Sequence, residues 1–407
     1  MNKNAFLPGS LWLCCQLAYS SLALATETDS FQPYVNEKIF YDSNLLLLPN
    51  KNDRPFSWPG SQRADVVNQL TAGAKFESSF KRQKFHADLS VRDNRYANNQ
   101  PLNYIGTDDK LSWDWRLGKH FYGQLAYGYQ QYMDSFSYYQ TILNNIISAN
   151  NAVFDVKYTW HPRWTLKGGV DFLDTSNSNE QRLTFNRQNT KTVMSLNYLI
   201  STNYTQAIEY SYTNVDYINR PPNYRSDRDN QYAIESIGVK SFWYLCPKKL
   251  HLITELNETM LKNAHFSNRD FSSPTGKLTL TWDVSSKVQW VLIGWRDVLS
   301  SQSSYGSYVI TEGISPSLEW RPRAKLTFKA RYAYRTDNYS GPSSADVVRN
   351  SSNIRLDTVT TTQAEVIYKP HSDIELGLTL KAETRDSSLS VWSYTDYISA
   401  VSAKLTF

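Results

Sequence analysis

The chain has few of the residues that build disulfide-bonded or metal-binding proteins. It contains three cysteines, and two of them, Cys14 and Cys15, lie within the first 25 residues. Only Cys246 remains once that segment is removed, so neither an internal disulfide nor a cysteine metal site is expected. The six histidines show no metal-pair spacing, and none stands with a serine and a carboxylate in a triad-like pattern. The sequence therefore predicts no metal, no cofactor and no catalytic residue.

Long apolar runs are also missing beyond the N-terminal segment. No later stretch approaches the run of about 18 apolar residues that a membrane-spanning helix needs. The formal net charge of +5 over 407 residues is too small an excess to indicate nucleic acid as a partner. No Gly-rich phosphate loop is present. These absences exclude a helical membrane protein and give no support to a nucleic-acid-binding protein.

The first 25 residues have the pattern of an export signal. The start, Met1-Asn-Lys3, is weakly basic, residues 5–24 are mostly apolar, and Ala23-Leu-Ala25 is a small-x-small cleavage site. The alternative is a buried N-terminal helix, which is disfavoured because the polar residues from Thr26 onward offer it no amphipathic continuation. We predict a signal peptide at residues 1–25 and a single exported domain at residues 26–407.

Aromatic residues and strand-like alternation are what the chain does contain. Phe, Trp and Tyr make up 14% of the residues, with 28 Tyr and 12 Trp. In the last stretch, Tyr397, Val401, Leu405 and Phe407 share one parity and more polar residues share the other, as in an amphipathic strand. From Gln69 onward such strands recur in pairs joined by short turns, and long polar connections separate the pairs. With Tyr34–Asp42 at the front, the count is about 18 strands, an even number typical of bacterial barrels.

The strict alternation of short turns and long connections distinguishes between all-β folds. A soluble sandwich or propeller also has many short strands but has no reason for this asymmetry. Periplasmic turns and extracellular loops produce it directly. Seven tryptophans near the short turns indicate an interfacial belt: Trp113, Trp115, Trp160, Trp164, Trp243, Trp282 and Trp320. We predict an all-β fold, an antiparallel transmembrane β-barrel of about 18 strands, surrounded by the lipid of a bacterial outer membrane.

The C-terminal strand is expected to close this barrel. It should pair with Tyr34–Asp42 on one side and with Ile374–Arg385 on the other. Because the chain ends on an aromatic residue where a terminus ordinarily frays, we predict that Phe407 lies at the periplasmic interface. A terminal aromatic residue also resembles the assembly signal of outer-membrane barrels, which implies that role for Phe407.

Parity also predicts which residues line the lumen. If the apolar residues face lipid, the alternate charged and polar residues face inward. These candidates are Asp88, Arg92, Asp114, Arg116, Tyr122, Asp155, Lys157, Lys167, Asp171, Glu209, Lys329, Arg331, Arg335, Glu375, Lys381, Glu383 and Arg385. Two interpretations stay open: the charges bias what passes through a wet channel, or they pair across strands and keep the wall polar and rigid.

The polar connections yield three further predictions. Tyr122, with Gln124, Gln130 and Tyr132 nearby, is a candidate carbohydrate path, although Tyr132 also fits a girdle tyrosine. The loop Tyr132–Asn150 is the expected constriction because Ile142, Leu143, Ile146 and Ile147 make it apolar. The acidic pairs Asp108-Asp109 and Asp227–Asp229 are interpreted as solvated loop carboxylates.

Several short motifs resemble those of a known family. They are Phe31-Gln-Pro-Tyr-Val35, Tyr41-Asp-Ser-Asn-Leu45 with Leu48-Pro49, Asp93-Asn-Arg-Tyr96, Trp113-Asp-Trp-Arg-Leu-Gly118 and Glu319-Trp-Arg-Pro-Arg323. This set is similar to the EpsL-type outer-membrane barrels encoded with exopolysaccharide biosynthesis operons. The resemblance implies a channel or scaffold in exopolysaccharide export, with a polysaccharide substrate and with periplasmic and inner-membrane export machinery as partners. The chain has Ser43 where the family has a second acidic residue.

Two other functions fit the same residues. A general or substrate-specific porin for small solutes needs the same wet, charge-lined barrel. An outer-membrane barrel enzyme needs only a few residues that folding brings together. Exopolysaccharide export is the function expected from the resemblance, with the porin as the first alternative.

Overall fold

The structure is a computed structural model, and it describes residues 30–50, 62–138, 142–222, 229–246, 249–300, 306, 308–341 and 355–407. The predicted signal peptide, residues 1–25, lies outside the described residues. Within these ranges, all regular structure belongs to one antiparallel sheet of 18 strands together with five short 3-10 helices. None of the helices in the described ranges is long and apolar enough to span a membrane.

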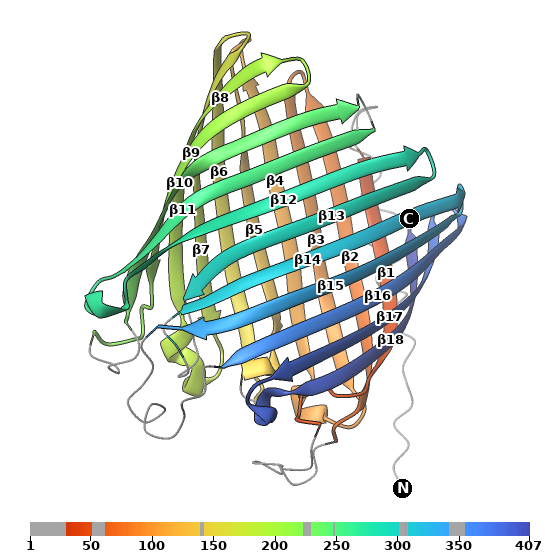
Figure 1. Cartoon of the computed structure of the whole chain (residues 1–407). Helices are drawn as coiled ribbons and strands as arrows, with labels where there is room; N and C mark the ends of the chain where they lie inside the picture. The colour runs from red at the N-terminus through yellow and green to blue at the C-terminus, as the bar shows by residue number, and fades with distance from the viewer. Residues whose placement is uncertain are drawn as a thin grey trace, which may run out of the picture.

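The strands follow one another around a closed barrel (Figure 1). They are β1 (Ser30–Asp42), β2 (Asp65–Phe80), β3 (Gln83–Tyr96), β4 (Tyr104–Leu117), β5 (Phe121–Met133), β6 (Ile146–His161), β7 (Trp164–Asn177), β8 (Arg187–Ser201), β9 (Tyr204–Asp216), β10 (Gln231–Cys246), β11 (Leu250–Asn263), β12 (Phe271–Ser285), β13 (Val288–Ser300), β14 (Tyr308–Arg323), β15 (Leu326–Ser340), β16 (Leu356–His371), β17 (Ile374–Ser387) and β18 (Tyr394–Thr406). Each pairs with its neighbours in sequence. The predicted fold class is confirmed.

The closing strand has the predicted partners. β18 pairs with β1 from Tyr34↔Thr406 to Asp42↔Ile398, and with β17 from Ile374↔Leu405 to Arg385↔Tyr394. The backbone N–H of Phe407 donates to the carbonyl of Pro33 at 2.8 Å. Closure leaves no open edge of the sheet for another chain to pair with.

The two ends of the barrel differ as expected. One end, the turn end, carries the connections of two or three residues within each hairpin, and it also holds the start of β1 and the end of β18. The other end, the loop end, carries the longer connections and the helices η1 (Gln100–Leu102), η2 (Phe136–Tyr138), η3 (Glu180–Phe185), η4 (Ser267–Arg269) and η5 (Ser390–Trp392).

Two loop boundaries were predicted wrongly. The pair Asp108-Asp109 was placed in a loop, but the β3–β4 connection is confined to residues 97–103, and both residues belong to β4. The loop expected at Tyr132–Asn150 is confined to residues 134–145. The reason is that the strands are 13 to 16 residues long, which exceeds the roughly 9–11 residues that cross a bilayer. Their extra length bears polar groups on the outside, such as the paired Glu235 and Lys262, so the apolar alternation ends before the strand does.

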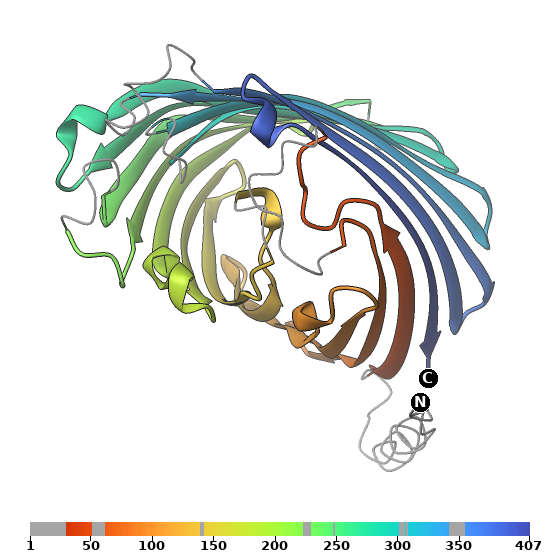
Figure 2. The ribbon, with the colours of Figure 1, turned by 90° about the horizontal axis from the view of Figure 1, so that it is seen from below.

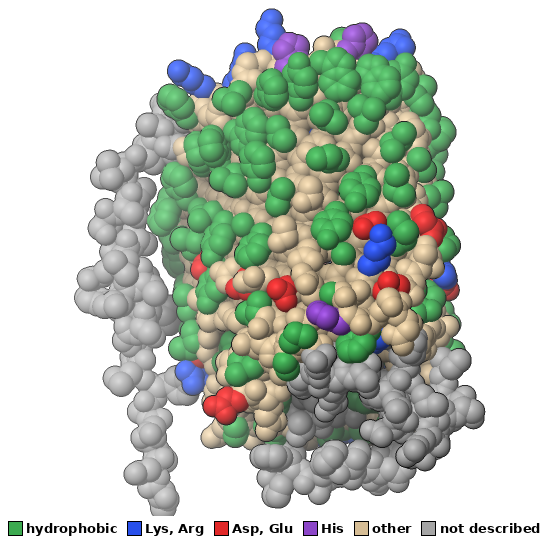
Figure 3. Space-filling model, turned by 90° about the vertical axis from the view of Figure 1, so that its left-hand side faces the viewer, with side chains coloured by type: hydrophobic (Ala, Val, Ile, Leu, Met, Phe, Trp, Pro, Cys, Tyr) green, Lys and Arg blue, Asp and Glu red, His purple; other side chains and the backbone are tan. Residues whose placement is uncertain are grey.

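The outer face is apolar over most of the barrel. Figure 3 shows hydrophobic side chains beneath a row of basic residues and histidines at the turn end, and charged groups closer to the loop end. The seven predicted belt tryptophans sit on this outward face near the short turns, and Trp290 joins them at 43% exposure. Several stack with neighbouring rings, as Trp160 does with Trp164 at 6.3 Å. The outer surface therefore has the apolar band and aromatic girdle of a barrel in lipid.

Candidate functional site

The inner face of the barrel carries every residue predicted to line the lumen. Successive strand residues point to opposite faces, and the parity of the predicted residues is opposite to that of the exposed apolar residues on each strand. They are Asp88 and Arg92 on β3, Asp114 and Arg116 on β4, Tyr122 on β5, Asp155 and Lys157 on β6, Lys167 and Asp171 on β7, Glu209 on β9, Lys329, Arg331 and Arg335 on β15, and Glu375, Lys381, Glu383 and Arg385 on β17. The strand registers place these side chains on one continuous inner wall.

Many inner charges are paired across neighbouring strands. Asp88 lies 3.7 Å from Lys75, and Asp155 lies 3.4 Å from Lys167. On the other side of the barrel, Lys329 lies 3.5 Å from Glu365. Most of these groups are about one-quarter to one-half exposed, so each pair adds little to stability. Their effect is to give the wall fixed, alternating charge and to keep it wettable.

Asp108 is an inner-wall residue that the sequence interpretation missed. Its carboxylate accepts from Gln130 at 3.0 Å, lies 3.1 Å from Lys110 and lies 3.8 Å from Arg92. The prediction of a solvated loop carboxylate was wrong because β4 begins at Tyr104 and places Asp108 inside the barrel. Asp108 and Asp114 lie at positions of the same parity on β4, so the inward placement predicted for Asp114 could have been extended to Asp108.

Tyr122 is held between two cations. The guanidinium of Arg116 on β4 lies 5.5 Å from the centre of the ring, and the Nζ atom of Lys157 on β6 lies 5.7 Å from it. Such contacts are attractive because the ring face carries negative charge. The ring is thus already partnered from both neighbouring strands, which counts against its use as a stacking surface for carbohydrate.

Three of the predicted residues on β17, Lys381, Glu383 and Arg385, lie in a dense polar network. Glu383 lies 2.9 Å from Lys381 and accepts from the hydroxyl of Tyr394 at 2.7 Å. Arg385 lies 3.9 Å from Asp357, whose carboxylate is fully buried and also pairs with Arg355 at 2.6 Å. These groups stabilise the loop end of the wall.

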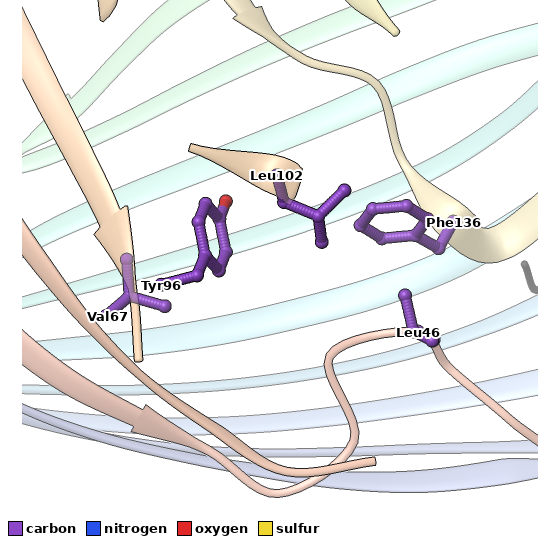
Figure 4. Packing of buried hydrophobic residues seen from close by; sticks show 5 residues of the cluster. All are labelled: Leu46, Val67, Tyr96, Leu102 and Phe136. Carbon is purple, nitrogen blue, oxygen red and sulfur yellow. The ribbon is translucent and has the colours of Figure 1, made fainter. Parts of the chain in front are cut away.

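Loops fold inward at the loop end and narrow the lumen. Figure 2 shows the segment after β1 running inside the ring of strands. Leu46 from this segment packs with Leu102 of η1 and Phe136 of η2, together with Val67 and Tyr96 of the wall (Figure 4). We call these five residues the loop cluster. All are at most 8% exposed, so they form a small apolar core that fixes three loops to one another.

Polar contacts hold the same loops in place. The side chain of Asn44 donates to the carbonyls of Leu48 and Thr395 at 3.0 Å and accepts from the N–H of Leu48 at 2.9 Å. The carbonyl of Ser137 accepts from Arg385 at 3.5 Å, which links the β5–β6 loop to the wall strand β17. The β5–β6 loop thus contributes to the constriction, as predicted, but two other loops contribute as well, and Ile146 and Ile147 belong to β6.

Polar cavities lie along the inner wall. One of about 340 Å³ spans the closure of the barrel, from Lys38 on β1 to Lys110 on β4 and Glu365 on β16. Another of about 580 Å³ lies against β8–β15, where its lining includes Asn257, Trp295 and Arg331. Within the described ranges, no group of three His, Cys, Asp or Glu side chains is arranged to hold a metal ion. The arrangement suits transient contact with small polar solutes.

Solved outer-membrane proteins share this fold, whereas no family model and no curated protein matches the chain. A BenF-like porin from Pseudomonas fluorescens Pf-5 superposes with a TM-score of 0.50 at 12% identity, over 94% of this chain and 99% of that one. OpdQ from Pseudomonas aeruginosa gives 0.48 at 11% identity, over 94% and 100% of the two chains. OccK5 (OpdH) from the same species gives 0.48 at 10% identity, over 93% and 98%. The chain is a β-barrel protein of the bacterial outer membrane.

These findings correct the expected function. Exopolysaccharide export was inferred from the EpsL-type resemblance, but a solved barrel that shares this fold is a BenF-like porin. The structure adds a physical objection, because the loop cluster narrows the lumen that a polymer would have to thread. The EpsL-type resemblance itself stays a prediction, resting on short motifs that no family model matches.

Proposed function

We propose that this protein is an outer-membrane porin through which small polar solutes diffuse. The observation that carries the proposal is a continuous polar inner wall with paired charges, narrowed at one end by the loop cluster. Barrels of this size enclose an aqueous channel unless loops plug them. The likeness in fold to a BenF-like porin supports the proposal.

The charges around the 340 Å³ cavity bear on what passes. Its lining contains four basic residues and four acidic ones: Lys38, Arg92, Lys110 and Lys404, and Asp88, Asp108, Glu365 and Glu375. Because the numbers of positive and negative residues are equal, the net electric field in the cavity is small. It therefore concentrates neither cations nor anions strongly. The proposed channel therefore selects by size and by polar contacts more than by charge.

The test is a conductance measurement on the purified full chain in planar bilayers. We expect discrete, persistent current steps and a reversal potential close to zero in a salt gradient, because the lining is charge-balanced. In liposomes loaded with sugars of increasing size, small ones should exchange quickly and large ones slowly. A protein that inserts as a folded barrel but passes neither ions nor small sugars would refute the porin function.

The apolar outer band supports lipid as a partner. The outward position of Phe407, which is 59% exposed at the turn end, supports its proposed role in assembly. Contacts with periplasmic or inner-membrane proteins stay a prediction.

A further inference from the structure

One tryptophan differs from all others in the described strands because it faces the lumen. Trp295 on β13 pairs with Lys277 on β12 and with Gly313 on β14, both inner-face positions. The remaining strand tryptophans have the outward parity. An indole on a polar wall is notable, since tryptophan rings normally occupy the core or the lipid interface.

Gly313 makes room for the indole ring. A Cβ atom at this position would lie 2.6 Å from Cη2 and 2.8 Å from Cε2 of Trp295. The six-membered part of the ring therefore lies over the glycine, where any other residue would displace it. Asn257 is accommodated in the same way over Gly238 on the inner face of β10. Two glycines on the inner wall, Gly313 and Gly238, thus leave space for the side chains of Trp295 and Asn257.

The ring of Trp295 has no aromatic or cationic partner among the described residues. Most outward tryptophans are stacked or tilted against a neighbouring ring, as Trp113 is on Phe85 at 5.9 Å and Trp243 is on Tyr204 at 3.9 Å. Inside the barrel, Tyr122 is occupied by Arg116 and Lys157. Trp295, which is only half-buried, instead borders the cavity of about 580 Å³, a size within the range of roughly 300–1,000 Å³ common for small-ligand sites.

The rest of this cavity is polar and close to charge-balanced. Hydroxyl groups of Ser236, Thr259 and Thr275 form a chain with separations of 2.9 and 2.8 Å. Three basic and three acidic residues line it from the inner face: Lys191, Lys277 and Arg331, and Glu209, Glu255 and Asp297. Arg296 also borders the cavity, but it is paired with Glu312. Such a lining offers donors and acceptors without a strong pull on either sign of charge.

We propose that Trp295 is a stacking platform for a neutral pyranose sugar in the channel. The inference rests on the proposed porin function and specifies a solute class for it. A pyranose presents a flat C–H face to the negative ring face of an indole, and its hydroxyls match Asn257 and the hydroxyl and charged groups nearby. A purely aromatic solute would stack equally well but would leave the polar lining without partners, which is costly.

The test is sugar-induced interruption of the ion current through the full chain in a planar bilayer. D-glucose is compared with sorbitol, which has similar hydroxyl chemistry but no ring, and with benzoate. We expect glucose to interrupt the current at lower concentrations than sorbitol or benzoate. Trp295→Ala should raise the glucose concentration for half-interruption about tenfold, and Trp295→Phe should retain much of the effect.

Matched controls separate the platform from general damage. Trp290→Ala removes a lipid-facing ring from the same strand and should leave the glucose effect unchanged. Gly313→Ala should weaken the glucose effect because it displaces the indole, whereas a Cβ at Gly294 meets only a carbonyl oxygen at 3.9 Å, so Gly294→Ala should not.

The outcomes distinguish the two proposals. If the chain conducts but glucose acts no better than sorbitol, or if Trp295→Ala changes nothing, the platform is refuted and the porin stands. Stronger interruption by benzoate than by glucose also refutes the sugar assignment. If the inserted wild-type barrel passes no current, the porin proposal itself has failed.

Discussion

Removing Phe136 from the loop cluster should widen the channel. Its ring is 5% exposed and packs in the cluster with Leu46 and Leu102. Truncation of a buried Phe to Ala costs about 3–5 kcal/mol, and we use the lower end because this core is small. Among the described residues, a link from this loop to β17 is the hydrogen bond from Arg385 to Ser137, which at 3.5 Å is long and contributes about 1 kcal/mol.

A loss of about 3 kcal/mol lowers the ratio of packed to released loops by roughly 100-fold, since 1.4 kcal/mol corresponds to a factor of ten. Once released, the loops move freely and no longer narrow the lumen. We therefore expect Phe136→Ala to raise the single-channel conductance, to increase current noise and to admit larger sugars in a liposome exchange assay.

The control is Phe121→Ala, which removes an outward ring that is 45% exposed. This variant should conduct like the wild type. Circular dichroism should show the same strand content in both variants, because the strand ladder does not involve either side chain. Unchanged conductance and size limit in a folded Phe136→Ala barrel would refute the assignment of the constriction to the loop cluster.

Three other predictions follow from the fold. Deleting Phe407 should impair insertion and leave the protein in the periplasm, as measured by cell fractionation; normal yield in the outer membrane would remove its assembly role. Cys246 is exposed at the turn end, so a membrane-impermeant maleimide should label it in broken cells but not in intact ones, and labelling of intact cells would reverse the orientation. Burial works to raise the pKa of Asp229, but hydrogen bonds from the ring and backbone N–H of His265 outweigh it and keep that pKa below its usual value. Because the pKa of Asp229 is lower in the folded protein, its contribution to stability is present above the unfolded pKa of about 3.9 and is lost as the pH falls through the folded pKa. The amide hydrogen of His265 should therefore exchange faster at acidic pH in the wild type. In Asp229→Asn its exchange should show no rise of this kind as the pH falls.

The sequence alone determined the barrel because its signals are local. A strand side chain alternates with its immediate neighbours, so parity on β3 or β17 separates Asp88 or Glu383 from the outward residues without knowledge of any partner strand. The lengths of turns and loops can likewise be read directly along the sequence. Closure of β18 on β1 followed from the absence of any other edge to pair with, and the structure confirms it.

The loop end was decided by tertiary structure. Asp229 was interpreted as solvated, but it is 4% exposed because the β11–β12 loop covers it. The loop cluster joins Leu46, Leu102 and Phe136, which come from three connections. Nothing in consecutive residues indicates which loops meet, because their ends are brought together only by the circumference and tilt of the closed barrel.

The same reason explains why Trp295 was missed. Its significance depends on Gly313 lying directly opposite it, and that register is set by the pairing of β13 with β14. Parity places an indole on the inner face, but only the register shows that a glycine lies beneath the ring and that the ring is left without a stacking partner. The sequence by itself determined which side of the wall each residue faces, and the tertiary structure decided which residues meet there, because pleating is a property of consecutive residues whereas register and loop packing belong to the closed sheet.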